Sequence, residues 1–355
     1  MSEKKSEKTI PKTLVSINEI STAWLQAVFD YAGVDVPAIV DSKIEPIGHG
    51  NSSHTCKVSL AYENHATDAP GSVICKFSLA EGKGAELVKK SGIYLCEAKT
   101  LNFLSKDSAA RIPKCYLASV SSDTSNFNLV AEDLSVFCRP GDQISGCSIA
   151  DAKAVVTELS RFHRQFWNAP ILDKIDWVIP TFDTYKYGLI VLRHRFTGRL
   201  SEEEFDFIER AISEIDRWLN DIPINRTLLH TDCRADNIMF DYRDANHPAA
   251  YLIDWAMVRI GDAMSDVAYF LTSSLSPQDR LACEMDMLAL HTQEIAAQDP
   301  TYTLEIAEQS YRKNIMSSMY LTLLSATGIP QAPHSDLLLN ALAQRNCAAI
   351  KHWLD

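Results

Sequence analysis

Short apolar runs separated by turns dominate the first third of the chain. A helical pattern at about residues 16–32 precedes three strand-like segments, KIEPIGHG, TCKVSLAYE and SVICKFSLA. The turn-rich sequence at 65–72 predicts that the last two strands are antiparallel. Residues 84–104 have the apolar spacing of a helix, and PKCYLASVSSDTSNFNLVAEDL predicts two more strands around a polar turn. This third therefore predicts a small antiparallel β-sheet with one key helix.

From about residue 148 the pattern becomes helical. A strand-rich island at 226–254, with the pattern strand–loop–strand–turn–strand, interrupts a series of amphipathic segments at 148–167, 201–219, 277–297, 302–325 and about 335–353. Together the patterns predict an α+β, bilobal chain. We expect a disordered tail at 1–12, a first lobe at 13–134 and a larger, mostly helical second lobe at 135–355.

The composition is that of an ordinary globular protein, since 46% of the 355 residues are hydrophobic and 23% are charged. A formal net charge of −12 argues against binding to nucleic acid or anionic membranes, which requires basic patches. No apolar run reaches the roughly 18 residues of a membrane span, and the charged N-terminus lacks the apolar core of a secretory signal. Nine cysteines without a CxxC pair indicate reduced thiols. We expect a cytoplasmic protein that is a monomer or weak homodimer.

A dense polar cluster lies in LLHTDCRADNIMFD, residues 228–241, between two apolar segments. If IMFD and YLIDW pair as an antiparallel hairpin, Asn237 lies beside Asp254, and Asp232 lies on the loop just before them. Carboxylate and amide oxygens suit Mg²⁺, which takes further ligands from phosphates. Asp232 would then be free to accept a proton from a hydroxyl, the arrangement that phosphoryl transfer needs.

Two other interpretations of this cluster are open. Aspartate and asparagine in turns commonly cap backbone groups without any chemical role. Alternatively, His230, Asp232, Asp236 and Asp254 could be the ligands of a metal-dependent phosphohydrolase, although such sites usually recruit further histidines.

The motif H-x-D-x-x-x-x-N, followed by LIDW with its aspartate 22 residues after Asp232, resembles the protein-kinase-like fold. Within that fold the chain is similar to the aminoglycoside phosphotransferase and choline kinase superfamily. With GDAMSDVAYFL it is most similar to the ecdysteroid-kinase-like branch. The resemblance implies Asp232 as catalytic base, Asn237 and Asp254 as Mg²⁺ ligands, His230 as an organiser of the loop, and Asp266 as the residue that steadies it.

The segment PIGHGNSSHTCKV at 46–58 is the candidate phosphate-covering loop of a nucleotide-binding first lobe. Gly48 and Gly50 would let the backbone approach a phosphate, while Asn51, Ser52 and Ser53 offer hydrogen-bond donors. A plain hairpin turn would have a similar sequence, and Ser53 stands where the protein-kinase loop has its third glycine.

Lys76 lies in an apolar strand-like run and needs a partner if it is buried. A nucleotide phosphate and Glu97, on the predicted helix, would provide one; the alternative is an edge-strand lysine exposed to solvent. At the join between the lobes, backbone groups around Ala131 and Asp133 could bind an adenine edge. The order of these residues along the chain matches the kinase-like order.

Arg234 could contact the transferred phosphate, pair with Asp236 or face solvent. His163, in an amphipathic segment, is expected to pack rather than to react. The acceptor should be selected by the helices after residue 277 and by residues near Trp255, Arg259 and Asp262. The acidic segment EMD at 284–286 could lie near a cationic acceptor or on a solvated helix face.

The sequence thus predicts an ATP- and Mg²⁺-dependent phosphotransferase, with GTP as the alternative donor, that acts on a hydroxyl of a small molecule. A catalytically silent pseudokinase and a metal-dependent phosphohydrolase are the alternatives.

Overall fold

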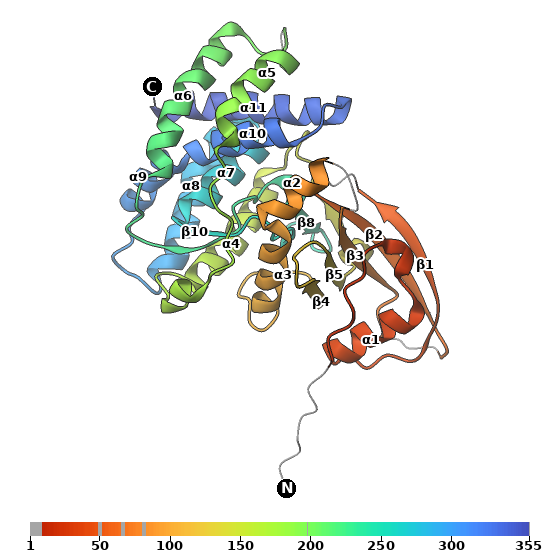
Figure 1. Ribbon diagram of the computed structural model, residues 1–355. Coiled ribbons are helices and arrows are strands. Elements are labelled where there is room, and N and C mark those ends of the chain that lie inside the picture. Colours follow the sequence, from red (N-terminus) through yellow and green to blue (C-terminus); the bar gives the residue numbers. More distant parts are fainter. Residues whose placement is uncertain (1–8, 49–51, 65–67, 80–82, 197, 355) are drawn as a thin grey trace. The chain divides into compact units, whose positions relative to one another are not determined.

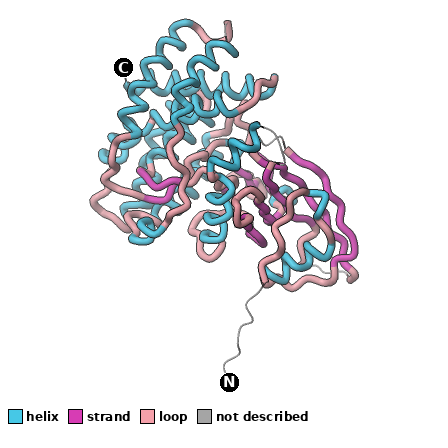
Figure 2. Tube along the Cα trace, viewed as in Figure 1, coloured by secondary structure: helices cyan, strands magenta, loops and turns pink. Residues whose placement is uncertain are grey.

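The computed structural model describes residues 9–48, 52–64, 68–79, 83–196 and 198–354. They form two compact units, the first of Met1–Asp107 with Pro113–Val136 and the second of Ser108–Ile112 with Phe137–Asp355. The short segment 108–112, inside the predicted first lobe, thus groups with the second unit. The larger sheet lies in the first unit, and the second is mostly helical (Figure 1, Figure 2). This architecture confirms the predicted α+β class.

The first unit is built on a five-stranded sheet in which every neighbouring pair is antiparallel. The order is β1-β2-β3-β5-β4, so β3 is the central strand. The strands are β1 (Ile39–Ile47), β2 (Ser53–Tyr62), β3 (Ser72–Ser78), β4 (Cys115–Val120) and β5 (Phe127–Glu132).

Helix α1 (Thr22–Ala32) follows the short 3₁₀ turn η1 (Ile17–Glu19) and ends at Gly33, which has a left-handed φ of 71°. Where the sequence predicted one helix over 84–104, the structure has α2 (Lys83–Ser91) and α3 (Ile93–Leu104). The break falls at Gly92, whose φ of 83° is one that glycine adopts at little cost.

The two faces of the five-stranded sheet make different contacts. Val73, Cys75 and Phe77 alternate along β3 and join the apolar core that includes α1. Lys76, between them, is on the opposite face, where it reaches Glu97 of α3. A period of two along one strand thus separates a stabilising core from a charged pair.

The second unit contains two small groups of strands. One is the three-stranded sheet β6-β8-β9, and the other is the antiparallel pair of β7 with β10. The predicted hairpin of IMFD with YLIDW is present as β8–β9. The strands are β6 (Cys138–Pro140), β7 (Thr227–Leu229), β8 (Ile238–Asp241), β9 (Ala249–Leu252) and β10 (Arg259–Gly261).

Helices surround these strands: α4 (Ile149–Gln165), α5 (Gly188–Phe196), α6 (Glu202–Leu219), α7 (Met264–Ser274), α8 (Pro277–Ala296), α9 (Leu304–Asn314), α10 (Met316–Gly328) and α11 (Pro333–Leu354). Short 3₁₀ turns are η2 (Leu134–Val136), η3 (Pro170–Lys174), η4 (Asp183–Tyr187) and η5 (Ala235–Asn237). Helix α10 is largely buried and packs against α5, α6, α7 and α11.

The sequence missed two features of this unit. The segment 302–325 forms two helices that separate at Ile315, where neither glycine nor proline marks the break. Helix α5, with the sequence GLIVLRHRF, is short and rich in apolar residues, so periodicity alone does not separate it from a strand.

Other sequence expectations have direct structural counterparts. Seven of the nine cysteines are buried thiols. The end of the predicted tail is anchored, because the carbonyl of Lys12 accepts a hydrogen bond from the indole of Trp24 at 2.9 Å. Within the described ranges, no helix is long and apolar enough to cross a membrane.

A close backbone approach fixes the segment after β6. The Gly141 N–H donates to the Ile238 carbonyl at 2.9 Å, and a Cβ added to Gly141 would collide with the carbonyl of Ala235. Only glycine fits here without a shift of the backbone. The segment at 141–146 is therefore held against the turn that carries Asn237.

We predict that Gly141→Ala lowers the free energy of unfolding by about 1–3 kcal/mol, because the collision is with backbone atoms that cannot move aside. Urea unfolding followed by circular dichroism measures this. Gly328→Ala is the matched control, since a Cβ there meets nothing within 4 Å. Equal stability of the two variants would contradict the close approach.

Candidate active site

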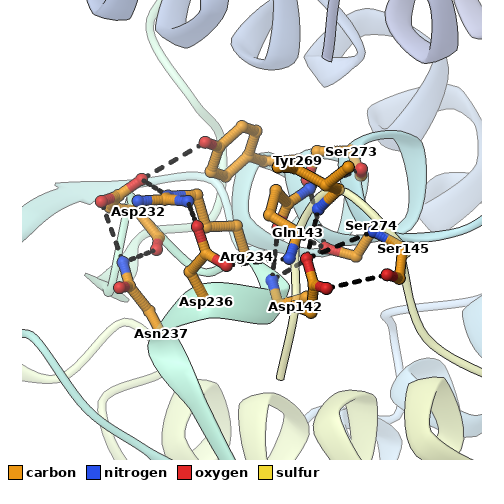
Figure 3. Close-up of polar contacts among 12 residues, drawn as sticks. Asp142, Gln143, Ser145, Asp232, Arg234, Asp236, Asn237, Tyr269, Ser273 and Ser274 are labelled. Atoms are coloured by element: carbon orange, nitrogen blue, oxygen red, sulfur yellow. Dashed lines mark hydrogen bonds and ion pairs between the residues drawn. The ribbon is translucent and has the colours of Figure 1, made fainter. Parts of the chain in front are cut away.

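The loop between β7 and β8 carries the candidate catalytic residue Asp232 (Figure 3). The Asn237 side-chain amide donates to the Asp232 carboxylate at 2.9 Å and to its backbone carbonyl at 2.8 Å. The Tyr269 hydroxyl donates to the other carboxylate oxygen at 3.3 Å. Asp232 is thus held from two sides, by the turn η5 and by helix α7, and about a quarter of its side chain stays exposed.

The backbone of this loop is fixed by Asp266, a fully buried aspartate of α7. Its two carboxylate oxygens accept the backbone N–H groups of His230 and Thr231, each at 2.7 Å. Thr231 has a left-handed φ of 69°, a conformation that costs a non-glycine residue energy. The charged acceptor compensates this cost and sets the direction in which Asp232 leaves the loop.

Two buried histidines support Asp266 in turn. His163 Nε2 lies 3.1 Å from the Asp266 carboxylate, and His163 Nδ1 lies 3.0 Å from His291 Nε2. Because a carboxylate accepts, His163 donates to Asp266 through Nε2. Burial lowers the pKa of His291 well below its ordinary value, so this ring is neutral. His163 therefore contacts the loop's anchor and not Asp232 itself.

His230 is also tied into the structure. Its Nε2 lies 2.9 Å from the carbonyl of Ile253, to which it donates, and its ring packs on Trp255 with the ring centroids 4.5 Å apart. These contacts join the start of the loop to the end of β9.

Arg234 pairs with Asp236 and lies 3.4 Å from the Asp232 carboxylate, measured from Nε. The sequence left three environments open for this side chain: the transferred phosphate, Asp236 and solvent. The structure shows the pairing with Asp236. Asp236 also accepts the backbone N–H of Gln143 at 2.8 Å (Figure 3). The Gln143 side chain accepts the N–H of Ala235 at 2.6 Å. The segment after β6 is therefore joined at two points to the loop between β7 and β8, residues 230–237, which we call the candidate catalytic loop.

Electrostatics make Asp232 a better proton acceptor than an exposed aspartate. Burial raises its pKa above the ordinary value, the charge of Arg234 opposes this shift, and the charge of Asp254 adds to it. For Arg234 the balance is reversed: burial lowers its pKa, but the carboxylates of Asp232 and Asp236 raise it overall. Arg234 therefore stays charged beside the candidate base.

The β8–β9 hairpin brings Asp254 close to the same point. Ile238 pairs with Leu252, and the N–H of Ile253 donates to the carbonyl of Asn237 at 3.0 Å. Asp254 follows directly, with a left-handed φ of 65° that turns the chain out of the strand.

The donor set at this end of the hairpin fits a hard divalent cation. The Asn237 amide nitrogen is used by Asp232, which leaves its oxygen for a cation, and Asp254 contributes a carboxylate. Within the described ranges, no three His, Cys, Asp or Glu side chains form a group that could hold a metal by themselves. Mg²⁺ is the cation this set suits, because it takes its other ligands from water and phosphate.

In the first unit, Lys76 is buried on the central strand and not on an edge. Its Nζ lies 2.9 Å from both carboxylate oxygens of Glu97, whose side chain is also buried. The alternative of a solvent-exposed, edge-strand lysine is therefore wrong.

The candidate phosphate-covering loop is only partly described. Gly48 has a left-handed φ of 70°, and Ser53 is buried at the start of β2. The carbonyl of Ser52 accepts a hydrogen bond from the Tyr94 hydroxyl at 2.7 Å. Gly50 and Asn51 lie outside the described residues.

Near the predicted adenine site, Ala131 lies in the ladder between β3 and β4. The N–H of Glu132 donates to the carbonyl of Lys114 at 2.9 Å. The Asp133 carboxylate is occupied by Lys57 at 2.8 Å and by Ser72 at 2.6 Å. Its side chain therefore has a structural task, and the adenine contact through this backbone stays a prediction.

Sequence reasoning did not find Tyr269 or Gln143. Tyr269 lies three residues after Asp266, so the helical spacing in SDVAYFL puts both on the loop-facing side of α7. Gln143 carries no such signal, because it meets Asp236 from more than 90 residues away along the chain.

A pocket opens beside the loop between β7 and β8, with Thr231, Ser265, Arg259 and Asp262 in its wall. Selection of the acceptor by residues near Arg259 and Asp262 stays a prediction. The acidic segment at 284–286 does not line this pocket. Glu284 is buried, pairs with Arg280 and accepts from Tyr311, whereas Met285 and Asp286 are exposed, as expected for a solvated helix face.

We predict that Asp266→Asn lowers the free energy of unfolding by about 2–3 kcal/mol, because the amide NH₂ would face one of two backbone donors in a buried site. Chemical unfolding measures the change. Asp286→Asn, at an exposed position of α8, should change stability by less than about 0.5 kcal/mol. An Asp266→Asn variant as stable as this control would contradict the role of Asp266 as the loop's anchor.

Comparisons with known proteins agree with this geometry. A family model described as "Phosphotransferase enzyme family" matches residues 148–295, which include the catalytic loop and the β8–β9 hairpin. No curated protein sequence matches the chain.

Solved structures of similar fold span most of the chain. Choline kinase from Cryptosporidium parvum has a TM-score of 0.52 at 12% identity and covers 88% of this chain and 90% of its own. Ethanolamine kinase from Plasmodium vivax has a TM-score of 0.51 at 12% identity, with 91% and 87% covered. APH(2″)-IIia in complex with GDP and kanamycin has a TM-score of 0.50 at 14% identity, with 85% and 89% covered. The chain therefore shares the protein-kinase-like fold of these structures.

Proposed function

We propose that this protein is a kinase that transfers the γ-phosphoryl group of ATP to a hydroxyl of a small molecule. The observation that carries the proposal is the convergence of Asp232, Asn237 and Asp254 at one end of the β8–β9 hairpin. The family match over residues 148–295 supports it. So do the choline kinase and ethanolamine kinase of similar fold, and the GDP complex, which also keeps GTP open as donor.

In the proposed mechanism, Asp232 accepts the proton of the acceptor hydroxyl as its oxygen attacks the γ-phosphorus. A bond forms between that oxygen and phosphorus, and the bond from phosphorus to the bridging oxygen of the nucleoside diphosphate breaks. Proton transfer to a positioned base typically contributes about 10²–10⁴-fold to the rate. Asn237 and Asp254 would hold Mg²⁺, which when bound neutralises charge on the phosphates.

The other residues have supporting roles in this proposal. Lys76, kept charged and oriented by Glu97, would contact the nucleotide phosphates. The segment with Gly48, Gly50, Asn51, Ser52 and Ser53 would cover them, and the backbone near Ala131 and Asp133 would meet the base. Arg234, whose guanidinium is tied to Asp236, would balance the charge of Asp232.

The alternatives differ in what they ask of the same residues. The phosphohydrolase needs Asp236 as a ligand, but Asp236 is held by Arg234 and by the backbone of Gln143. These contacts favour the kinase. A pseudokinase would keep the nucleotide site without turnover. The ecdysteroid-kinase-like branch, a cytoplasmic location and a monomer or weak homodimer stay predictions from sequence.

We predict that ATP with Mg²⁺ raises the thermal stability of the wild type, by about 2.7 kcal/mol at 100 times the dissociation constant. Asp254→Ala should abolish the part that needs Mg²⁺, and Asp286→Ala, on an exposed helix face, should not. Asp232→Asn should keep the shift and lose about 10²–10⁴-fold in turnover with any acceptor found by screening. No shift with ATP or GTP would refute the proposal, and a shift without turnover on any acceptor would favour the pseudokinase.

A further inference from the structure

The pocket beside the catalytic loop lies entirely within the second unit. It is partly open to solvent, and its cavity volume is about 100 Å³. Leu229 and Thr231 of the loop region form one wall, and Ser265, next to the anchor Asp266, forms another. Thr231 directly precedes Asp232 in the sequence, so this wall adjoins the residue that carries the candidate base.

Much of the pocket is apolar. Trp218 and Leu219 at the end of α6, Ile260 of β10, and Tyr320 and Leu321 of α10 contribute to its walls. The Trp218 indole and the Tyr320 hydroxyl have partners in the protein, since Trp218 donates to Asn314 at 2.9 Å and Tyr320 accepts from the N–H of Phe182 at 3.1 Å. These walls therefore suit the apolar body of a ligand.

The two acidic side chains of the pocket are already engaged. Asp221 forms an ion pair with Lys313. Asp262 accepts the N–H of Met264 at 2.9 Å with one carboxylate oxygen and the hydroxyl of Ser310 with the other. These contacts orient both carboxylates within the protein.

The contacts of Arg259 differ from those of the two acids. Its Nη2 donates to the Thr181 hydroxyl at 2.8 Å, and within the described ranges no carboxylate lies within ion-pair distance of it. A guanidinium has five N–H groups, so most of its donors are available. Burial lowers the pKa of Arg259, whereas nearby carboxylates raise that of Arg234. The strand pairing of Arg259 with Leu229 fixes its backbone beside the catalytic loop.

A partly desolvated cation in a pocket is most stable when an anion completes it, and a carboxylate matches the guanidinium with two parallel hydrogen bonds. We infer that the pocket binds an apolar hydroxy acid as phosphate acceptor, with its carboxylate on Arg259, its body on the apolar walls and its hydroxyl at Asp232. This inference rests on the proposed kinase function. The reaction would convert the hydroxy acid and ATP into the O-phosphorylated acid and ADP, with the hydroxyl proton passing to Asp232.

Binding to the full-length protein without nucleotide tests the acceptor assignment separately from catalysis. The probes are phenyllactate and mandelate, each compared by calorimetry with its primary amide, which keeps the hydroxyl and the ring but has no charge. We predict that the acids bind about 10- to 100-fold more tightly than the amides, the range expected for a hydrogen-bonded charged pair. Equal affinity of acid and amide, or no binding of either acid, would overturn the assignment.

Three variants locate the effect. Arg259→Met should remove the preference for acid over amide, Arg259→Lys should retain part of it because the charge stays, and Arg217→Met, at an exposed position of α6, should leave it unchanged. A purely structural Arg259 would lower the melting temperature of Arg259→Met without changing that preference, and this outcome would overturn the inference. Inorganic phosphate that displaces the acids at equal affinity would show a general anion site and would overturn the assignment to carboxylates.

Turnover separates the two proposals. If the acids bind through Arg259 but ATP phosphorylates neither of them nor any other acceptor, the binding assignment stands and the kinase proposal fails. If ATP phosphorylates ethanolamine or the amides equally well in the wild type and in Arg259→Met, the kinase proposal stands and the hydroxy-acid assignment is overturned.

Discussion

The candidate site depends on a buried carboxylate that does not itself reach the reacting atoms. Asp266 accepts two consecutive backbone N–H groups from the catalytic loop, and this holds Thr231 in a left-handed conformation. Hydrogen bonds to a charged acceptor in a buried site are among the stronger ones in proteins, about 1.5–3 kcal/mol each. That is of the order of the strain in one unfavourable backbone conformation. The direction of Asp232 therefore follows from a contact on helix α7.

Residues of other elements hold Asp266 and the loop in place. His163 and His291 support its carboxylate from α4 and α8, and Tyr269, three residues further along α7, reaches Asp232 directly. Gln143 holds the far side of the loop from the segment after β6. Helices contributed by distant parts of the chain thus fix a loop of eight residues, 230–237, whose own strands are only three and four residues long.

Three other cations differ from Arg259 in their partners. Lys76, Arg234 and Arg280 each have a carboxylate partner, and their roles are to orient, to balance the candidate base and to stabilise the helical core. Burying a charge is costly unless it is paired. In each of these pairs the carboxylate offsets the cost of burying the cation. Arg259 meets a neutral hydroxyl instead. Its position beside the loop, and not its residue type, distinguishes it.

The sequence by itself determined the class of fold and the hairpin beside which the candidate site residues gather. Alternation in β3, the turn at 65–72 and the short spacing from Asp232 to Asn237 are local patterns, and a hairpin follows from residues adjacent in the chain. Tertiary structure decided what local patterns cannot encode: the break at Ile315, the burial of Glu284, the partner of Arg234 and the contact of Gln143 with Asp236. Those outcomes depend on segments far apart in sequence. A charged side chain can form a buried ion pair or hold a loop in place. Which of these it does depends on the distant element that packs against it.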